Sequence, residues 1–227
     1  MKNLVVLTGA GISAESGIKT FRDADGLWEG HDVMEVASPE GFRANPELVL
    51  DFYNQRRRQL KEVSPNKAHH NLKELEKNFN VHIVTQNVDD LHERAGSKSV
   101  LHLHGELRKV RSTQNSDLVY TWNDDLVIGN YCENNTQLRP HIVWFGEEVP
   151  LLEKAAEITF QADILVIIGT SMQVYPAASL IHYTKPNIPI YFIDPNPTIS
   201  EWEFKNLAII KEVASKGTEI LIEILRS

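Results

Sequence analysis

The fold of this chain is decided by a stretch near its start, Val5-Val6-Leu7-Thr8-Gly9-Ala10-Gly11-Ile12-Ser13-Ala14-Glu15-Ser16-Gly17-Ile18. A short apolar run leads into a glycine turn, and a helix start is predicted directly after the turn. Gly9 and Gly11 allow a sharp turn and a close approach to a ligand, because no Cβ stands in the way. Backbone N–H groups at a helix N-terminus, with Ser13 and Ser16 beside them, suit a pyrophosphate. The third glycine does not fall where the pattern G-x-G-x-x-G needs it, so the turn taken alone is explained equally well by plain chain reversal.

Farther along the chain, apolar runs alternate with helical patterns. Runs that are apolar throughout are predicted as buried parallel strands, and they cover Asn3–Thr8 and residues 81–85, 99–103, 163–169 and 188–193. Helical patterns lie between or after them, at residues 46–63, 67–77, 151–161, 177–183 and 215–225. This alternation predicts an α/β fold with a doubly wound parallel sheet that is covered on both faces.

Two segments interrupt the alternation and predict a small lobe. We expect one unit over residues 1–227, with a core formed by residues 1–18, 80–104 and 141–227 and a lobe formed by the insertions 19–79 and 105–140. The second insertion is polar and contains a β-like piece at residues 118–122. The apolar groups available to hold the lobe together are Leu118, Tyr120, Trp122, Leu126 and Ile128.

Composition excludes several classes of protein. The formal net charge is −8 and the longest basic run is only Arg56-Arg57-Arg58, so nucleic-acid binding is not expected. No apolar stretch reaches 18 residues, which argues against a membrane span, and the apolar residues before Thr8 are too few for a signal peptide. The single cysteine, Cys132, excludes an internal disulfide and a cysteine-based zinc site. A cytoplasmic protein is expected.

Polar groups follow the predicted strand at residues 81–85. Because ligands of doubly wound sheets lie beyond the carboxyl ends of the strands, Gln86, Asn87 and Asp89 are candidates for binding a ribose or a carboxamide. An Asx turn with a helix cap at Asp89 or Asp90 explains the same residues without a ligand.

Two more strand ends carry candidate groups. His104 stands against Gly105 at the end of one predicted strand, where an imidazole with a pKa near 7 can act as a general base, although a purely structural histidine fits the position as well. Gly169-Thr170-Ser171 ends another strand and offers hydroxyl groups for a ribose or a phosphate.

Together these motifs resemble the sirtuins, the NAD-dependent protein-lysine deacylases. The resemblance covers nearly the whole chain, in the order of the family: Gly9–Ser13 with Gly17, Phe21-Arg22, Gln86-Asn87-x-Asp89, His104-Gly105, Trp144-Phe145-Gly146-Glu147 and Gly169-Thr170-Ser171. It implies a Rossmann-like domain with a small lobe, and NAD and an acyl-lysine meeting between them. It also implies that nicotinamide and O-acyl-ADP-ribose are the products.

The resemblance implies a role for each matching residue. His104 is the expected base, with Asn87 and Asp89 as further catalytic residues that order the ribose and the carboxamide. The expected NAD-binding residues are Gly9, Ala10, Gly11, Ile12, Ser13, Ser16, Gly17, Phe21, Arg22, Trp28, Gln86, Asn87, Asp89, Gly169, Thr170, Ser171, Asp194 and Ala214. The expected substrate-binding residues are Ala24, Tyr53, Arg56, Val143, Trp144, Phe145, Gly146 and Glu147, and residues 143–147 are expected to pair with the substrate backbone as an added strand.

The chain departs from the family pattern in two places. Most sirtuins have four cysteines that bind zinc after the catalytic histidine, whereas residues 105–138 contain only Cys132. One thiolate cannot build a tetrahedral site, so a zinc-free lobe and no bound metal are expected. Asp194 stands where many relatives have an asparagine, and its carboxylate can still accept hydrogen bonds from ribose hydroxyls.

Tyr53 and Arg56 bear on which acyl group is removed. Their i, i+3 spacing places them on one helix face, which taken alone is explained by a solvated basic face. Within the family, this pair marks the branch that removes succinyl and malonyl groups, and a guanidinium matches a carboxylate bidentately. Ala24 is a small residue that leaves room for a longer acyl chain. Arg57 and Arg58 are expected to lie on other faces, exposed to solvent.

Alternatives to a desuccinylase or demalonylase remain open at this point. One is a deacetylase, in which Tyr53 and Arg56 only pack the lobe and charge its surface. Another is a non-catalytic module that binds NAD or ADP-ribose, although the presence of His104 beside Asn87 and Asp89 argues against it. ADP-ribosyl transfer also occurs in the family. The expected partners are acyl-lysine proteins or peptides, and a monomer is expected.

Overall fold

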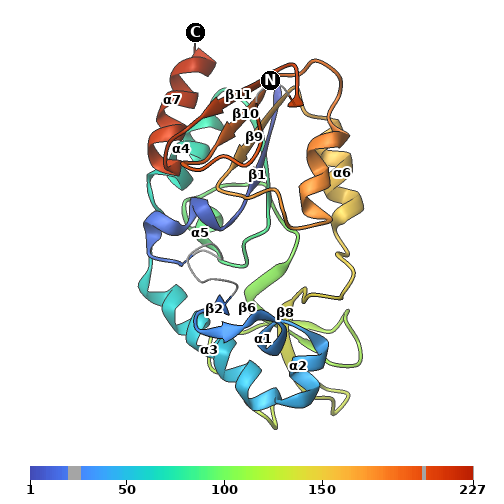
Figure 1. Cartoon of the computed structure of the whole chain (residues 1–227). Helices are drawn as coiled ribbons and strands as arrows, with labels where there is room; N and C mark the ends of the chain where they lie inside the picture. The colour runs from blue at the N-terminus through green and yellow to red at the C-terminus, as the bar shows by residue number, and fades with distance from the viewer. Residues whose placement is uncertain (20–26, 201–202, 227) are drawn as a thin grey trace.

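A six-stranded parallel sheet forms the upper part of the molecule in the computed structural model (Figure 1), which describes residues 1–19, 27–200 and 203–226. The strand order is β11-β10-β9-β1-β4-β5. The strands are β1 (Asn3–Thr8), β4 (Asn80–Thr85), β5 (Val100–His102), β9 (Ile164–Ile168), β10 (Ile190–Ile193) and β11 (Leu207–Ile210). The chain therefore proceeds outward from β1 first to one side and then to the other, which confirms the predicted doubly wound sheet.

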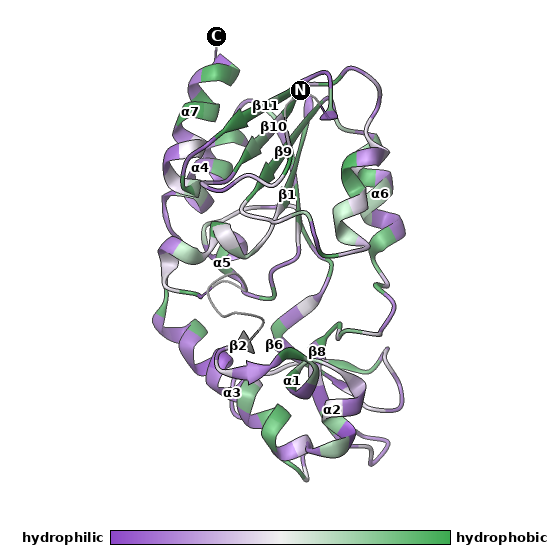
Figure 2. Cartoon of the chain, viewed as in Figure 1, coloured by the Kyte–Doolittle hydropathy of each residue, from purple (hydrophilic) through white to green (hydrophobic). Residues whose placement is uncertain are grey.

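Both faces of this sheet are covered by helices. Successive side chains of β1 point to opposite faces, so Leu4 and Val6 pack toward α4 (Lys67–Leu75) and α7 (Ala214–Arg226). Val5 and Leu7 pack toward α6 (Leu152–Phe160) and the 3₁₀ helix η4 (Ala177–Tyr183). The central strands are accordingly the most hydrophobic segments of the molecule (Figure 2).

A second, smaller group of elements forms the lower part of the molecule (Figure 1). Three helices lie there, α1 (Val33–Val36), α2 (Pro39–Ala44) and α3 (Pro46–Glu62). They accompany an antiparallel sheet with the order β7-β6-β8 and a two-stranded ribbon. The strands are β6 (Gly105–Ser112), β7 (Val119–Thr121), β8 (Leu138–Ile142), β2 (Leu27–Trp28) and β3 (His31–Asp32).

The structure differs from the sequence-based expectation at α4. This helix was expected in the small lobe, but its stripe Ala68, Leu72 and Leu75 is buried in the core of the large sheet. The apolar spacing i, i+4, i+7 predicts a helix without saying which partner covers it.

Two expectations about exposure are wrong. Arg57 was expected in solvent, but it is 1% exposed. Its Nε donates to Leu107 O at 3.1 Å, and its Nη1 donates to Asn54 Oδ1 at 2.7 Å. Ile128 was expected to hold the lobe together, but its side chain is 46% exposed. Leu126 is buried in the lobe as expected, with Leu118, Tyr120 and Trp122 packed at its edge.

No helix among the described residues is long and apolar enough to cross a membrane.

Candidate active site

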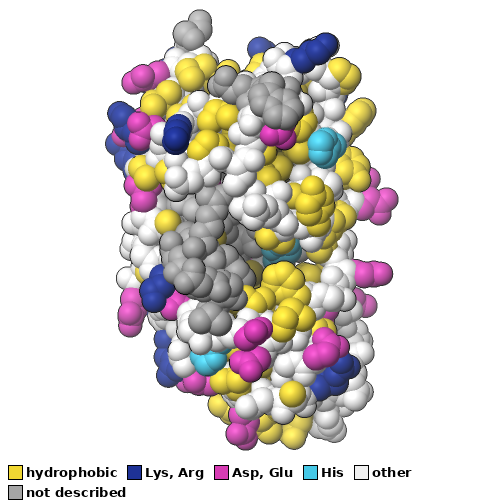
Figure 3. Space-filling model, viewed as in Figure 1, with side chains coloured by type: hydrophobic (Ala, Val, Ile, Leu, Met, Phe, Trp, Pro, Cys, Tyr) yellow, Lys and Arg dark blue, Asp and Glu magenta, His cyan; other side chains and the backbone are white. Residues whose placement is uncertain are grey.

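A cavity of about 850 Å³ lies between the large sheet and the smaller group of elements. Hydrophobic side chains border the hollow between the two parts on the face seen in Figure 3. The carboxyl ends of β1, β4, β9 and β10 contribute to its wall, as do α3 and residues 143–147. The cavity therefore lies at the point where the strand order of a doubly wound sheet reverses, which is the usual ligand site of such sheets.

The glycine turn after β1 packs closely against the turn after β9. Gly9 N donates to Ile168 O at 3.0 Å and Gly11 N donates to Gly169 O at 2.8 Å. A Cβ on Gly11 would lie 2.6 Å from the Cα of Gly169, so glycine is needed for the approach of the two backbones rather than for access by a ligand. Ala10 N meets no acceptor among the described residues and lines the cavity, so its N–H is free for a phosphate.

Three polar side chains form a buried network beneath this turn. Ser13 Oγ donates to Asp89 Oδ2 at 2.9 Å and accepts from Asn87 Nδ2 at 3.1 Å. Asp89 Oδ1 also accepts from Leu91 N at 3.1 Å, so the Asx cap that was the alternative for this residue is present as well. Burial raises the pKa of Asp89 above its ordinary value. The Ser13 hydroxyl is thus already hydrogen-bonded within the protein, and it fixes the side chains of Asn87 and Asp89, which line the cavity.

His104 lines the cavity with one ring nitrogen already committed. Its Nδ1 lies 3.1 Å from Gln86 O, and a carbonyl only accepts, so Nδ1 carries the proton. The lone pair is therefore on Nε2. Burial lowers the pKa of His104, and the Gln86 carbonyl opposes this only in part, so the ring is neutral near pH 7. Gly105, with φ +85°, allows the chain to turn there, where a Cβ would lie 2.0 Å from His141 O.

His102 occupies a different position, although alternation places it near His104. Its Nδ1 lies 2.9 Å from Asn87 O and its Nε2 lies 2.7 Å from Glu93 Oε1, so both nitrogens face acceptors. Burial acts to lower the pKa of His102, but Glu93 outweighs it and the net pKa is raised. His102 does not line the cavity; it holds the backbone of Asn87 from behind.

The opposite end of the cavity is lined by groups from α3. Tyr53 is fully buried from solvent, and its Oη accepts from the indole Nε1 of Trp144 at 2.9 Å. Arg56 is half-buried and stacks on Phe52, with its Nη1 donating to Phe52 O at 2.6 Å. Arg56 Nε has no hydrogen-bond partner, and within the described part of the chain no carboxylate forms an ion pair with this guanidinium.

Residues 143–147 line the cavity as expected, but most of their N–H groups are already used. Val143 N donates to His104 O, Phe145 N donates to Ala37 O, and Glu147 N donates to Trp144 O. Trp144 N donates to the carboxylate of Glu147 at 2.8 Å. The side chains of Trp144 and Glu147 therefore point into the protein, and what this stretch presents for an added strand is the Gly146 N–H, its carbonyl groups and the exposed Phe145 ring.

Most of the predicted site residues that the structure describes line this one cavity. Those that follow strands of the large sheet are Gln86, Gly169, Thr170, Ser171 and Asp194; Ala214 at the start of α7 and Trp28 in the ribbon join them. Ile12, Ser16 and Gly17 do not line it: Ile12 is buried in the core, and Ser16 Oγ accepts from Asn66 Nδ2. Phe21, Arg22 and Ala24 lie outside the described residues.

Sequence reasoning missed part of the wall. Asn196 follows the end of β10, and Val213 immediately precedes α7; both line the cavity. The rule that ligands lie beyond the carboxyl ends of parallel strands would have indicated Asn196, because this residue closely follows the end of β10. The described residues contain no group of three or more His, Cys, Asp or Glu side chains that would hold a metal ion.

Comparisons with known proteins agree with this geometry. A model of the Sir2 family matches residues 9–176. An NAD-dependent protein deacylase of Helicobacter pylori (strain ATCC 700392 / 26695) is 67% identical over 195 residues, which cover 86% of this chain and 85% of that protein.

Solved structures give the same result. The ADP-ribose complex of a mutant Sir2 homologue superposes with a TM-score of 0.88 at 40% identity, and the match covers 99% of this chain and 92% of that one. A Sir2 homologue in complex with NAD superposes with a TM-score of 0.86 at 39% identity, covering 99% and 90%. The chain therefore belongs to the Sir2 family, and the resemblance of its motifs to the sirtuins is confirmed.

Proposed function

We propose that this chain removes succinyl and malonyl groups from lysine side chains of proteins or peptides, with NAD as cofactor and nicotinamide and O-acyl-ADP-ribose as products. The broader activity, NAD-dependent protein deacylation, follows from membership of the Sir2 family and from the name of its relative in Helicobacter pylori. The acidic acyl group is the narrower part of the proposal, and it rests on α3.

The residues around the cavity fit NAD. The free Ala10 N–H suits a phosphate, and Asp194 and Thr170 lie at the carboxyl ends of neighbouring strands, where they reach ribose hydroxyls. Asn87 and Asp89, held in place by Ser13, suit the nicotinamide end. When bound, NAD supplies the bond to nicotinamide that is cleaved and the ribose hydroxyl that receives the acyl group.

His104 is the group that moves a proton. Its Nδ1–H is held by Gln86 O, so its Nε2 lone pair faces the cavity and accepts the proton of a ribose hydroxyl. The lowered pKa keeps this nitrogen unprotonated near neutral pH. Gln86 in turn donates from Nε2 to Thr170 Oγ1 at 3.2 Å. Gln86 therefore connects His104 to Thr170, which is one of the expected NAD-binding residues.

One observation carries the acyl preference: Arg56 lines the cavity, its Nε has no hydrogen-bond partner, and no carboxylate among the described residues forms an ion pair with it. A half-buried guanidinium is unfavourable without an anionic partner. A succinyl or malonyl group supplies a carboxylate at this position, whereas an acetyl group leaves Arg56 as it is. A charge-assisted hydrogen bond contributes about 1.5–3 kcal/mol, which corresponds to roughly 10- to 150-fold in selectivity.

The test compares Arg56→Met with Arg58→Met on peptides that differ only in the acyl group. Arg58 is the matched control because it lies on the same helix with an exposed side chain, whereas Arg57 is unsuitable because it is buried. We expect Arg56→Met to raise the KM for succinyl-lysine by about 10- to 100-fold and to leave acetyl-lysine unchanged. Equal losses on both substrates would make Arg56 a structural residue and support a deacetylase instead.

A further inference from the structure

The hydroxyl group of Tyr53 is oriented by Trp144, whose indole N–H donates hydrogen bonds and does not accept them. Trp144 Nε1 lies 2.9 Å from Tyr53 Oη. An indole N–H donates and cannot accept, so the tyrosine oxygen must be the acceptor in this bond. The hydrogen of the Tyr53 hydroxyl is therefore directed away from Trp144.

No acceptor for that hydrogen is found among the described residues, and Tyr53 lines the cavity beside Arg56. Burial raises the pKa of Tyr53, so the hydroxyl keeps its proton at neutral pH. The donor is thus present and without an acceptor in the part of the chain that the structure describes. A carboxylate, which only accepts, is the chemical group that fits it.

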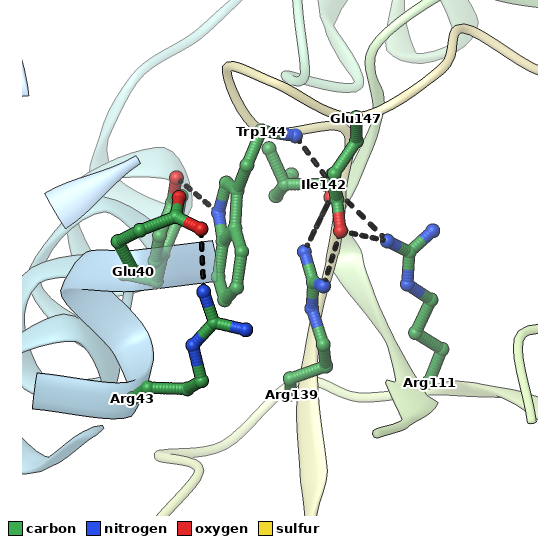
Figure 4. Close-up of polar contacts among 8 residues, drawn as sticks. Glu40, Arg43, Arg111, Arg139, Ile142, Trp144 and Glu147 are labelled. Carbon is green, nitrogen blue, oxygen red and sulfur yellow. Dashed lines mark hydrogen bonds and ion pairs between the residues drawn. The ribbon is translucent and has the colours of Figure 1, made fainter. Parts of the chain in front are cut away.

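Trp144 is itself held in place by a group of charged side chains, Arg111, Arg139 and Glu147 (Figure 4). The Arg139 guanidinium lies over the indole ring, 3.3 Å from its centroid. Arg139 is held by Glu147 through two hydrogen bonds of 2.6 and 3.1 Å, and Arg111 binds the same carboxylate at 3.1 Å. Glu147 also accepts from Trp144 N at 2.8 Å. The indole ring therefore has little freedom to move its N–H.

We infer that Trp144 is a positioning residue for acyl selectivity, which directs the Tyr53 hydroxyl hydrogen toward the distal carboxylate of a succinyl or malonyl group. This inference rests on the proposed function, because it assigns a carboxylate to the end of the cavity formed by Tyr53 and Arg56. It places the selectivity determinant partly outside α3, in the segment that follows β8.

The test is a double-mutant cycle on the ratio of kcat/KM for succinyl-lysine to that for acetyl-lysine. Trp144→Phe removes the indole N–H and keeps an aromatic ring over Arg139. We expect Tyr53→Phe to lower the ratio about tenfold or more through KM, which is the loss of one hydrogen bond to a carboxylate. Trp144→Phe, which removes only the neutral bond that orients the hydroxyl, should lower the ratio about fivefold. Because Trp144 acts through Tyr53, the double variant should lose no more than Tyr53→Phe alone. Trp122→Phe, which removes an indole N–H outside the cavity, should leave the ratio unchanged.

Losses that multiply in the double variant, or a ratio unchanged by Trp144→Phe, would overturn the inference. If the ratio responds to Arg56→Met but not to Trp144→Phe, the proposed function stands and only the role of Trp144 falls. If Arg56→Met does not change the ratio either, both fall.

A second measurement does not depend on the folding of the Trp144 variant. The chain has four tryptophans, so its indole N–H resonances are few. The resonance that shifts in Tyr53→Phe should also shift when a succinyl-lysine peptide binds to the wild-type enzyme in the presence of NAD, and an acetyl-lysine peptide should leave it in place. If this resonance does not shift when the succinyl-lysine peptide binds, the inference is contradicted.

Discussion

His104 illustrates how a single hydrogen bond decides what a residue can do. Gln86 O accepts from Nδ1, which leaves Nε2 as the base, and burial lowers the pKa of the ring. A base works when it is unprotonated, so a lowered pKa extends activity to lower pH. We therefore expect the apparent pKa of the acid limb, in a plot of kcat/KM against pH, to be lower than the ordinary histidine value of about 6.5.

Replacing this histidine tests its role. His104→Ala should lower deacylation by about 10²- to 10⁴-fold, the usual contribution of a general base. The melting temperature and NAD affinity should stay close to those of the wild type, because the one hydrogen bond that the ring makes to a described residue is to a backbone carbonyl. His70→Ala, at an exposed histidine, is the control for histidine removal. Normal turnover in His104→Ala would exclude it as the base.

At the scale of elements, α3 serves two cores at once. One stripe of the helix, with Phe52 and Tyr53, packs toward the cavity, while Leu50 belongs to the core of the small sheet. Asn54 and Arg57 follow Leu50 at i+4 and i+7, so they lie on the same stripe. Arg57 is therefore buried. It links α3 to β6 through Leu107 O, and it also donates to Asn54 on its own helix.

Arg57→Ala should accordingly destabilise the fold. It removes the guanidinium donor from Leu107 O, Asn54 Oδ1 and Asp124 O, although Asn54 Oδ1 still accepts from Leu126 N. A buried acceptor left without a donor costs about 1–3 kcal/mol of unfolding free energy. Arg58→Ala, on the exposed face, should change stability by no more than about 0.5 kcal/mol. Urea unfolding of both variants makes the comparison. Equal midpoints would mean that Arg57 is not part of the core.

The elements also show where the sequence alone is sufficient. Strands buried on both faces, such as β1 and β9, are uniform apolar runs and were predicted. β6 alternates charged and apolar residues and was predicted only as part of a polar insertion, because its exposed side chains mask the buried ones. The short strand β11 was not predicted. Its first and last residues are buried, whereas the two residues between them are more exposed.

In the site, too, some features were predicted from the sequence and others were not. The rule for strand ends placed Gln86, Asn87, Asp89 and His104 at one cavity. The N–H groups of Gly9 and Gly11 were expected to face a ligand, but they donate to Ile168 O at the end of β9 and to Gly169 O directly after it. That contact joins segments about 160 residues apart in the chain, so no local pattern indicates it. The burial of Arg57 depends on β6 in the same way.

At the scale of the whole molecule, a pair of buried histidines joins α4 to the centre of the sheet. The rings of His69 and His92 lie 4.9 Å apart, and His92 Nε2 is 3.1 Å from Thr8 Oγ1. Burial lowers the pKa of His69 to about 4 and that of His92 well below its ordinary value. Both are therefore neutral in the folded protein at neutral pH.

This predicts a loss of stability in acid. Between about pH 6.5 and 4 the unfolded chain binds protons that the folded state excludes, so the free energy of unfolding falls as pH falls. For His69 alone the loss amounts to about 3 kcal/mol over that window. His69→Gln should remove this part, and glutamine at N3 can still accept from the Asn66 N–H as His69 does. Urea unfolding at pH 7 and pH 4.5 measures it; the same pH dependence in both proteins would contradict the assignment.

The central claim is that the cavity is built for an acidic acyl group, and a competition experiment tests it most directly. Acetyl-, malonyl- and succinyl-lysine versions of one peptide are mixed at equal concentration with the wild-type enzyme and NAD, and their rates of consumption give the ratios of kcat/KM. We predict that the succinyl and malonyl peptides are consumed at least about tenfold faster than the acetyl peptide, as one charge-assisted hydrogen bond to Arg56 requires. Consumption of the acetyl peptide first, or of all three at one rate, would contradict the account.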